Sequence, residues 1–136
     1  MSVKYLNPDR LHENPAFSQV VTTEGNARTV YVGGQNSVSP SGEVVGKGDM
    51  RQQASQVFKN LEIALSAADA RIENVIKWNV YVVQDQPPHP AFEEFQRVWG
   101  NRPNPPLVTV LFVAGLANPD FLLEIDAIAV VSENNG

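Results

Sequence analysis

The sequence of 136 residues contains no cysteine, which excludes a disulfide framework, a zinc–thiolate centre, an iron–sulfur cluster and a thiol nucleophile. Charged residues are also scarce, at 18% against about 25% in an average globular domain. Ten Lys and Arg against fifteen Asp and Glu give a net charge of −5, which argues against nucleic-acid binding because that needs a basic surface. The two isolated histidines offer no obvious metal site.

Long apolar runs are missing as well. No run approaches the roughly 18 residues of a membrane-spanning helix, and the amino-terminal residues lack the apolar core of a signal peptide. We therefore expect a cytoplasmic protein that does not enter a membrane. The length and an apolar fraction of 43% fit one globular domain over residues 1–136, with a frayed acidic tail at 132–136.

The spacing of apolar residues predicts helices in two places. From Asp49 to Ala68, apolar side chains recur three and four residues apart, and Asp49 followed by Gln52 resembles a capping box. A second helix is predicted after Pro90, with Gly100 as its stop. Its apolar face comprises Phe92, Phe95, Val98 and Trp99.

Most of the remaining chain has strand character. The predicted strands are Arg28–Gly34, Val75–Val83, Leu107–Ala114 and Phe121–Val131. The last two are apolar on both faces, which is typical of strands that are covered on both sides. Two helices cannot cover both faces of a sheet, so we expect an α+β fold with helices on one face and subunit association on the other.

A series of motifs runs in order along the chain, from Asn7-Pro8 to Val131. They are Gly33-Gly34-Gln35, Ser41-Gly42-Glu43-Val44-Val45-Gly46, Gln53 with Gln56-Val57, Asn60-Leu61, Leu65-Ser66-Ala67-Ala68, Val75-Ile76-Lys77 with Val80-Tyr81-Val82, and Glu124-Ile125-Asp126-Ala127-Ile128-Ala129. Together they resemble the Rid family of reactive-intermediate deaminases, also called YjgF-type or RidA-like proteins. The resemblance implies a chorismate-mutase-like α+β fold, with a mixed sheet, two helices on one face, and a homotrimer with a barrel-like centre. It also implies cofactor-free hydrolysis of enamines or imines, such as 2-aminoacrylate, in clefts between subunits.

The resemblance assigns residues to the cleft, and several depart from the family pattern. The Arg that holds the substrate carboxylate in the archetype aligns with Val108, and a Tyr and a Ser of the pattern align with Phe17 and Gly33. Glu124, the acid thought to position the attacking water, is retained. We therefore predict a cleft that is more apolar than in the archetype. Its rim would comprise Phe17, Gly33, Gly34, Val108, Val110 and Glu124.

Several interpretations stay open at this point. The protein is a divergent deaminase with a neutral, larger or differently anchored substrate, or a non-catalytic trimer that binds a small metabolite; a nuclease fits the net charge of −5 poorly. Glu124 is catalytic, or it only accepts backbone hydrogen bonds at a subunit seam. The pair Gly33-Gly34 faces the cleft, or it marks a bulge or close approach where only glycine fits. Arg102 is a candidate substitute for the missing cation.

Overall fold

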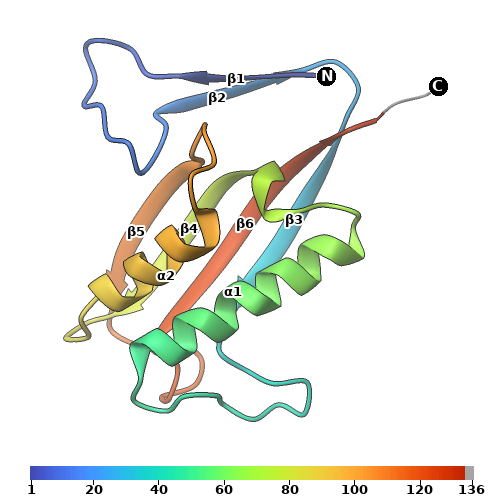
Figure 1. Ribbon diagram of the computed structural model, residues 1–136. Helices are drawn as coiled ribbons and strands as arrows, with labels where there is room; N and C mark the ends of the chain where they lie inside the picture. The colour runs from blue at the N-terminus through green and yellow to red at the C-terminus, as the bar shows by residue number, and fades with distance from the viewer. Residues whose placement is uncertain (134–136) are drawn as a thin grey trace.

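The computed structural model describes residues 1–133 and confirms the predicted α+β fold (Figure 1). The elements in chain order are β1 Ser2–Leu6, β2 Val20–Glu24, β3 Ala27–Gln35, α1 Met50–Ala67, a short 3-10 turn Ile72–Asn74, β4 Val75–Val83, α2 His89–Trp99, β5 Leu107–Val113 and β6 Leu123–Ser132. Figure 1 shows α1 and α2 on the same face of the larger sheet. Among the described residues, no helix combines the length and apolarity needed to span a membrane.

The larger sheet has the strand order β3-β6-β4-β5 and is mixed. β6 pairs antiparallel with both β3 and β4, whereas β4 and β5 run parallel because α2 carries the chain across between them. β1 and β2 form a separate antiparallel pair. Alternation along β6 sends Leu123 and Ile125 into the core under the helices and Glu124 and Asp126 to the opposite face. This alternation decides on which side of the sheet each candidate residue lies.

α1 spans Met50–Ala67, in agreement with the helix predicted between Asp49 and Ala68. The Asp49 side chain accepts a hydrogen bond from the Gln52 backbone N–H at 3.1 Å, which satisfies one of the free amides of the first turn. Inside the helix, the fully buried Gln53 donates to the carbonyls of Gly46 and Asp120 and accepts from the Leu122 amide at 2.9 Å. A buried amide with all of these partners ties α1 to the loop that leads into β6.

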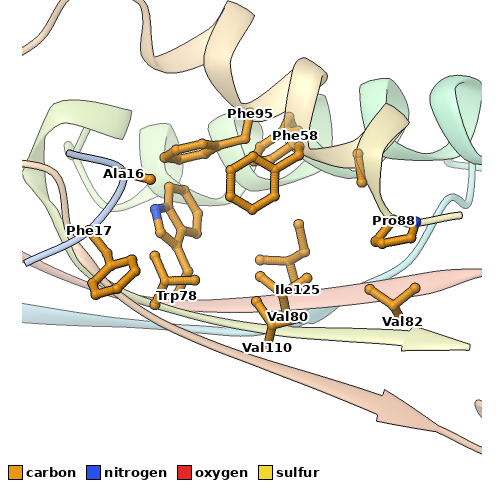
Figure 2. A pocket seen from close by; sticks show the side chains of 13 residues that line it. Ala16, Phe17, Phe58, Trp78, Val80, Val82, Pro88, Phe95, Val110 and Ile125 are labelled. Atoms are coloured by element: carbon orange, nitrogen blue, oxygen red, sulfur yellow. The ribbon is translucent and has the colours of Figure 1, made fainter. Parts of the chain in front are cut away.

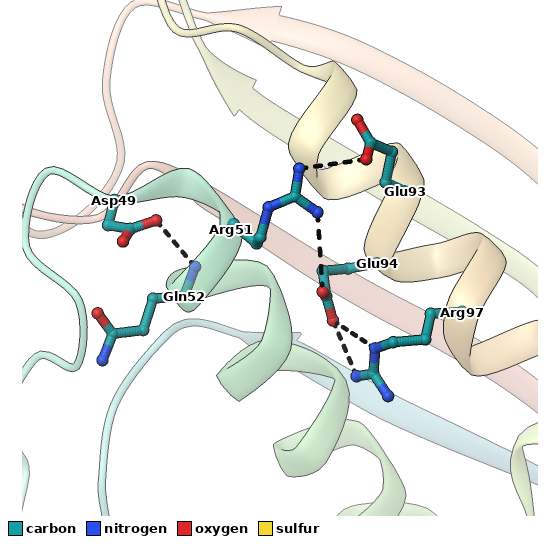
Figure 3. Close-up of polar contacts among 6 residues, drawn as sticks. All are labelled: Asp49, Arg51, Gln52, Glu93, Glu94 and Arg97. Carbon is teal, nitrogen blue, oxygen red and sulfur yellow. Dashed lines mark hydrogen bonds and ion pairs between the residues drawn. The ribbon is translucent and has the colours of Figure 1, made fainter.

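α2 is joined to α1 by a charged cluster that Figure 3 shows. Glu94, only 8% exposed, accepts two hydrogen bonds from Arg97 at 2.8 and 3.0 Å and lies 4.0 Å from Arg51 of α1. The same Arg51 pairs with Glu93 at 3.2 Å. The predicted apolar face of α2 is wrong in one respect, because Phe92 is 47% exposed instead of joining the core.

Aromatic rings fill the space between the helices and the sheet. Trp78 of β4 packs edge-on against Phe58 of α1 and Phe95 of α2, with ring centroids 6.0 and 6.3 Å apart. Phe95 in turn stacks on Trp99 at 6.1 Å. These contacts fix the distance of α2 from the sheet and the orientation of the Trp78 indole.

The opposite face of the sheet is open in the single chain. Tyr31 of β3 is 77% exposed and Leu111 of β5 is 49% exposed on this face. The predicted fraying is wrong for Ser132 and Glu133, because Ser132 ends β6 and Glu133 bonds to Arg28 and to the carbonyl of Asn26. The other residues of the predicted frayed tail, 134–136, lie outside the described part of the chain.

Candidate functional site

An apolar cavity of about 170 Å³ lies between α2 and the helix-facing side of the sheet (Figure 2). Its described lining comprises Ala16, Phe17, Phe58, Trp78, Val80, Val82, Pro88, Ala91, Phe92, Phe95, Val108, Val110 and Ile125. All of these side chains are apolar apart from the indole N–H of Trp78. The cavity therefore offers an apolar shape and no side-chain charge, and the indole N–H itself is buried away from contact.

The register of two parallel strands builds the floor of this cavity. Trp78 of β4 is paired with Val108 of β5, and Val80 with Val110, so these four residues lie on one face of the sheet. Phe17 reaches the same cavity from the segment before β2. The predicted site residues Phe17, Val108 and Val110 are thus brought together by the fold.

Phe17 is held beside β5 by a neighbour that sequence analysis did not single out. The hydroxyl of Ser18, a residue that is 4% exposed, donates to the Pro105 carbonyl at 2.6 Å, and its amide donates to the Pro106 carbonyl at 3.2 Å. A buried serine with two backbone partners is a structural anchor. The only signal in the sequence was its position directly after Phe17 in a segment with no regular structure.

Glu124 and Gly34 form a second cluster, on the other face of the sheet. A Cβ atom built on Gly34 would lie 2.7 Å from the carboxyl carbon of Glu124, so the carboxylate rests directly on the glycine backbone. Glu124 Oε1 accepts a hydrogen bond from Asn36 Nδ2 at 3.1 Å. Gly33 lies in the same β-bulge, but a Cβ built there meets nothing within 4 Å. Close approach therefore explains the glycine at 34 and not the one at 33.

A relay of side-chain amides connects this cluster to α1. Asn60 donates to the backbone carbonyls of Asn36 and Val38, both at 3.0 Å, and accepts from Gln56 at 2.9 Å. The loop after β3 is thereby fixed to the helix, and with it the Asn36 side chain that holds Glu124. Sequence analysis counted Gln56 and Asn60 only as motif residues and gave them no function.

A second carboxylate lies beside Glu124 on the same face. Asp126 accepts from Asn79 at 2.8 Å and from the Tyr81 hydroxyl at 3.4 Å. The negative charge of Asp126, followed by desolvation, the hydrogen bond and the charge of Glu124, raises the pKa of Tyr81 above its ordinary value. The outer face therefore concentrates negative charge where Glu124 lies.

Five of the six predicted site residues thus fall into two groups on opposite sides of one sheet, and Gly33 is part of neither group. Phe17, Val108 and Val110 line the cavity, whereas Gly34 and Glu124 are in contact on the far side. Arg102 belongs to neither group, because its guanidinium donates to the Val98 and Trp99 carbonyls at 2.9 and 2.8 Å and caps the end of α2. Within residues 1–133, no group of three or more His, Cys, Asp and Glu side chains is arranged to hold a metal ion.

Comparison with known proteins identifies the class of this fold and then the family. A Rid-family protein of unknown function from Yersinia pestis matches with a TM-score of 0.83 at 29% identity, over 96% of this chain and 100% of that one. The sequence pattern of the Endoribonuclease L-PSP family matches residues 8–131, so the chain belongs to this family. The resemblance stated from the motifs is confirmed.

Named relatives match at lower identity or over a shorter stretch of this chain. A 2-iminobutanoate/2-iminopropanoate deaminase of Dermatophagoides farinae is 26% identical over 130 residues, which cover 93% of this chain and 99% of the relative. A RutC family protein of Pyrococcus horikoshii is 35% identical over 101 residues, or 74% of this chain and 77% of the relative.

Proposed function

We propose that this protein is a cofactor-free deaminase that hydrolyses a neutral enamine or imine to a carbonyl compound and ammonia, in clefts between the subunits of a homotrimer. The observation that carries the proposal is the Glu124 carboxylate, which rests on Gly34 and is held by Asn36 at 3.1 Å. A carboxylate fixed at one oxygen keeps the other free to orient a water molecule.

The reaction needs little from the protein. An enamine first tautomerises to its imine, and Glu124 then accepts a proton from water as the water oxygen bonds to the C=N carbon. Protonation of the nitrogen and collapse of the carbinolamine release ammonia and leave the carbonyl product, with the Glu124 proton returned. A positioned carboxylate contributes about 10²–10⁴-fold to such a step.

The division of the candidate residues between two faces supports the proposed trimer. The face that carries Glu124 also exposes Tyr31 at 77% and Leu111 at 49%, a pattern typical of a covered interface. If that face packs against a neighbouring subunit, its Glu124 meets the cavity with Phe17 and Val108 of the neighbour. A cytoplasmic location and a single domain over residues 1–136 are parts of the same proposal.

The substrate is neutral because the described cavity lining holds no cation. A charge-assisted contact to a carboxylate is worth about 1.5–3 kcal/mol, and its absence at Val108 weakens anionic substrates roughly ten- to 150-fold. The same apolar lining favours a second candidate function, a trimer that binds a small metabolite without turnover.

The test is ammonia release from enzymatically generated 2-iminobutyrate and from the neutral imine of acetophenone. We expect turnover above background, faster for the neutral imine, that Glu124→Gln lowers at least a hundredfold. Asp126→Asn is the matched control, since it removes a carboxylate from the same strand and face, and it should retain most of the turnover. No turnover of either imine by the wild type would favour the binding protein.

A further inference from the structure

The loop between β1 and β2, residues 7–17, forms its hydrogen bonds almost within itself. Gln19 closes the base of the loop, because its amide donates to Asn7 Oδ1 at 3.1 Å and its side chain donates to the His12 carbonyl at 2.6 Å. In the described chain, every hydrogen bond of residues 7–17 has its partner between residues 7 and 19. No hydrogen bond therefore ties the loop itself to the sheet or to the helices.

The loop reaches the cavity only with its last residues. Residues 7–13 and Pro15 are exposed, whereas Ala16 and Phe17 are half-buried and line the cavity. Directly after them, the Ser18 hydroxyl donates to the Pro105 carbonyl at 2.6 Å and fixes this end of the loop to the start of β5. A segment with few buried side chains and only local hydrogen bonds has low local stability. We therefore expect the loop to move before the rest of the fold.

The indole N–H of Trp78 faces this loop and has no hydrogen-bond partner among residues 1–133. Trp78 is 2% exposed, and Figure 2 shows its nitrogen on the side of the ring that faces Ala16. The ring is held by Phe58 and Phe95, which pack edge-on against it. A buried donor without an acceptor is costly. Displacement of Ala16 would let water reach the nitrogen and would remove this cost.

We propose that residues 7–17 form a lid that opens and closes over the Ala16 end of the cavity, with Ser18 as the latch that holds it closed. Closure buries Ala16 and Phe17 but leaves the Trp78 N–H unpaired, so the two contributions oppose each other. The inference rests on the proposed function only in treating the cavity as the substrate side of the cleft. It adds a control of access to that cavity.

The test is hydrogen–deuterium exchange of the indole N–H groups in the ¹⁵N-labelled wild type. The sequence has two tryptophans, so Trp99→Phe assigns both resonances. Relative to free indole, we expect the Trp78 N–H to be protected at least about tenfold less than the slowest backbone amides of α1. Its rate should stay constant in dilute urea while theirs rises, because local opening exposes little surface. Equal protection, or an equal rise with urea, would overturn the inference, since Trp78 would then exchange only through global unfolding.

A matched pair of variants assigns the opening to this loop. Ser18→Ala removes the latch hydroxyl and should speed exchange of the Trp78 N–H roughly two- to twelvefold relative to the slow amides of α1. Ser39→Ala removes an exposed hydroxyl bonded within another loop, to Ser41, and should leave this ratio unchanged. An unchanged ratio in Ser18→Ala would overturn the inference.

The wild-type measurement decides the question even where Ser18→Ala does not fold. It needs no substrate, so failure of the lid and failure of the deaminase are separate outcomes. Exchange by local opening without imine turnover contradicts only the deaminase. Imine turnover in a protein whose Trp78 N–H exchanges only through global unfolding contradicts only the lid.

Discussion

At the scale of single residues, the position of Glu124 depends on what Gly34 lacks. The carboxylate occupies the space where any side chain at 34 would begin, and Asn36 holds one of its oxygens. The sequence predicted a glycine pair at a bulge or close approach. The sequence alone does not show which of the two glycines is required. The contact that requires glycine at 34 is made by the Glu124 side chain, which lies on a strand about 90 residues further along the chain.

Gly34→Ala should therefore displace the Glu124 carboxylate from Asn36. We expect a loss of about 1–3 kcal/mol in the free energy of unfolding, from the overlap with the new methyl group, and at least a tenfold lower rate of ammonia release. Thermal unfolding and imine turnover measure the two effects. Gly33→Ala is the control, since a Cβ there meets nothing within 4 Å, and equal effects at both positions would contradict the account.

Tyr81 reports the negative charge beside Glu124. Because Asp126 raises the pKa of Tyr81, this tyrosine should ionise above the ordinary value of about 10, and Asp126→Asn should lower the pKa of Tyr81. The contribution of Tyr81 to stability is complete below pH about 10 and is lost as the pH rises further, since the unfolded phenol releases its proton first. Phenolate absorbance against pH checks this; an unchanged titration in Asp126→Asn would refute it.

At the scale of elements, local signals predicted the helices well. The cap at Asp49 and the apolar spacing that follows act within one or two turns, so the bounds of α1 could be predicted from the sequence. The exposure of Phe92, 47%, could not be predicted from the sequence. It depends on the cavity between α2 and β5, and the local sequence of α2 contains no information about that cavity. The same holds for the hydrogen bonds of Ser18, whose acceptors lie 87 and 88 residues away.

The amide relay from α1 makes Asn60 a positioning residue for Glu124. Asn60→Ala removes two hydrogen bonds to the loop after β3, and we expect a loss of about 1–3 kcal/mol in the free energy of unfolding. The rate constant of turnover should fall while the KM for the neutral imine of acetophenone stays unchanged, because the cavity lies on the other face. Gln56→Ala, which removes only the bond to Asn60, should have smaller effects. A larger effect in Gln56→Ala, or a raised KM for this imine in Asn60→Ala, would argue against the relay.

At the scale of the whole molecule, the candidate site residues of one chain lie in two groups on opposite faces of the sheet. The apolar strands predicted subunit association from the sequence, and the resemblance predicted a trimer. Neither told which candidate residues share a face, because that depends on the alternation and register of β6, β4 and β5. Only the structure shows which candidate residues lie on each face of the sheet.

Tyr31→Asp should disrupt the proposed trimer by placing a charge on the open face of the sheet. We expect the mass in solution to fall from three times the chain mass of 14.9 kDa to that of one chain, and imine turnover to be lost with it. Light scattering after gel filtration measures the mass. Ile63→Asp is the control, as Ile63 is 68% exposed on α1, away from that face. A trimer that survives Tyr31→Asp would place the interface elsewhere.

The most direct test of a shared site is complementation between subunits. Glu124→Gln lacks the carboxylate and Val108→Trp fills the cavity, so each variant alone should be inactive on the neutral imine of acetophenone. Unfolded together in equal amounts and refolded, they form mixed trimers in which about a quarter of the clefts combine an intact Glu124 with an intact cavity. Ammonia release at about a quarter of the wild-type rate is the predicted result. A mixture no more active than its separate components would contradict a site built from two subunits.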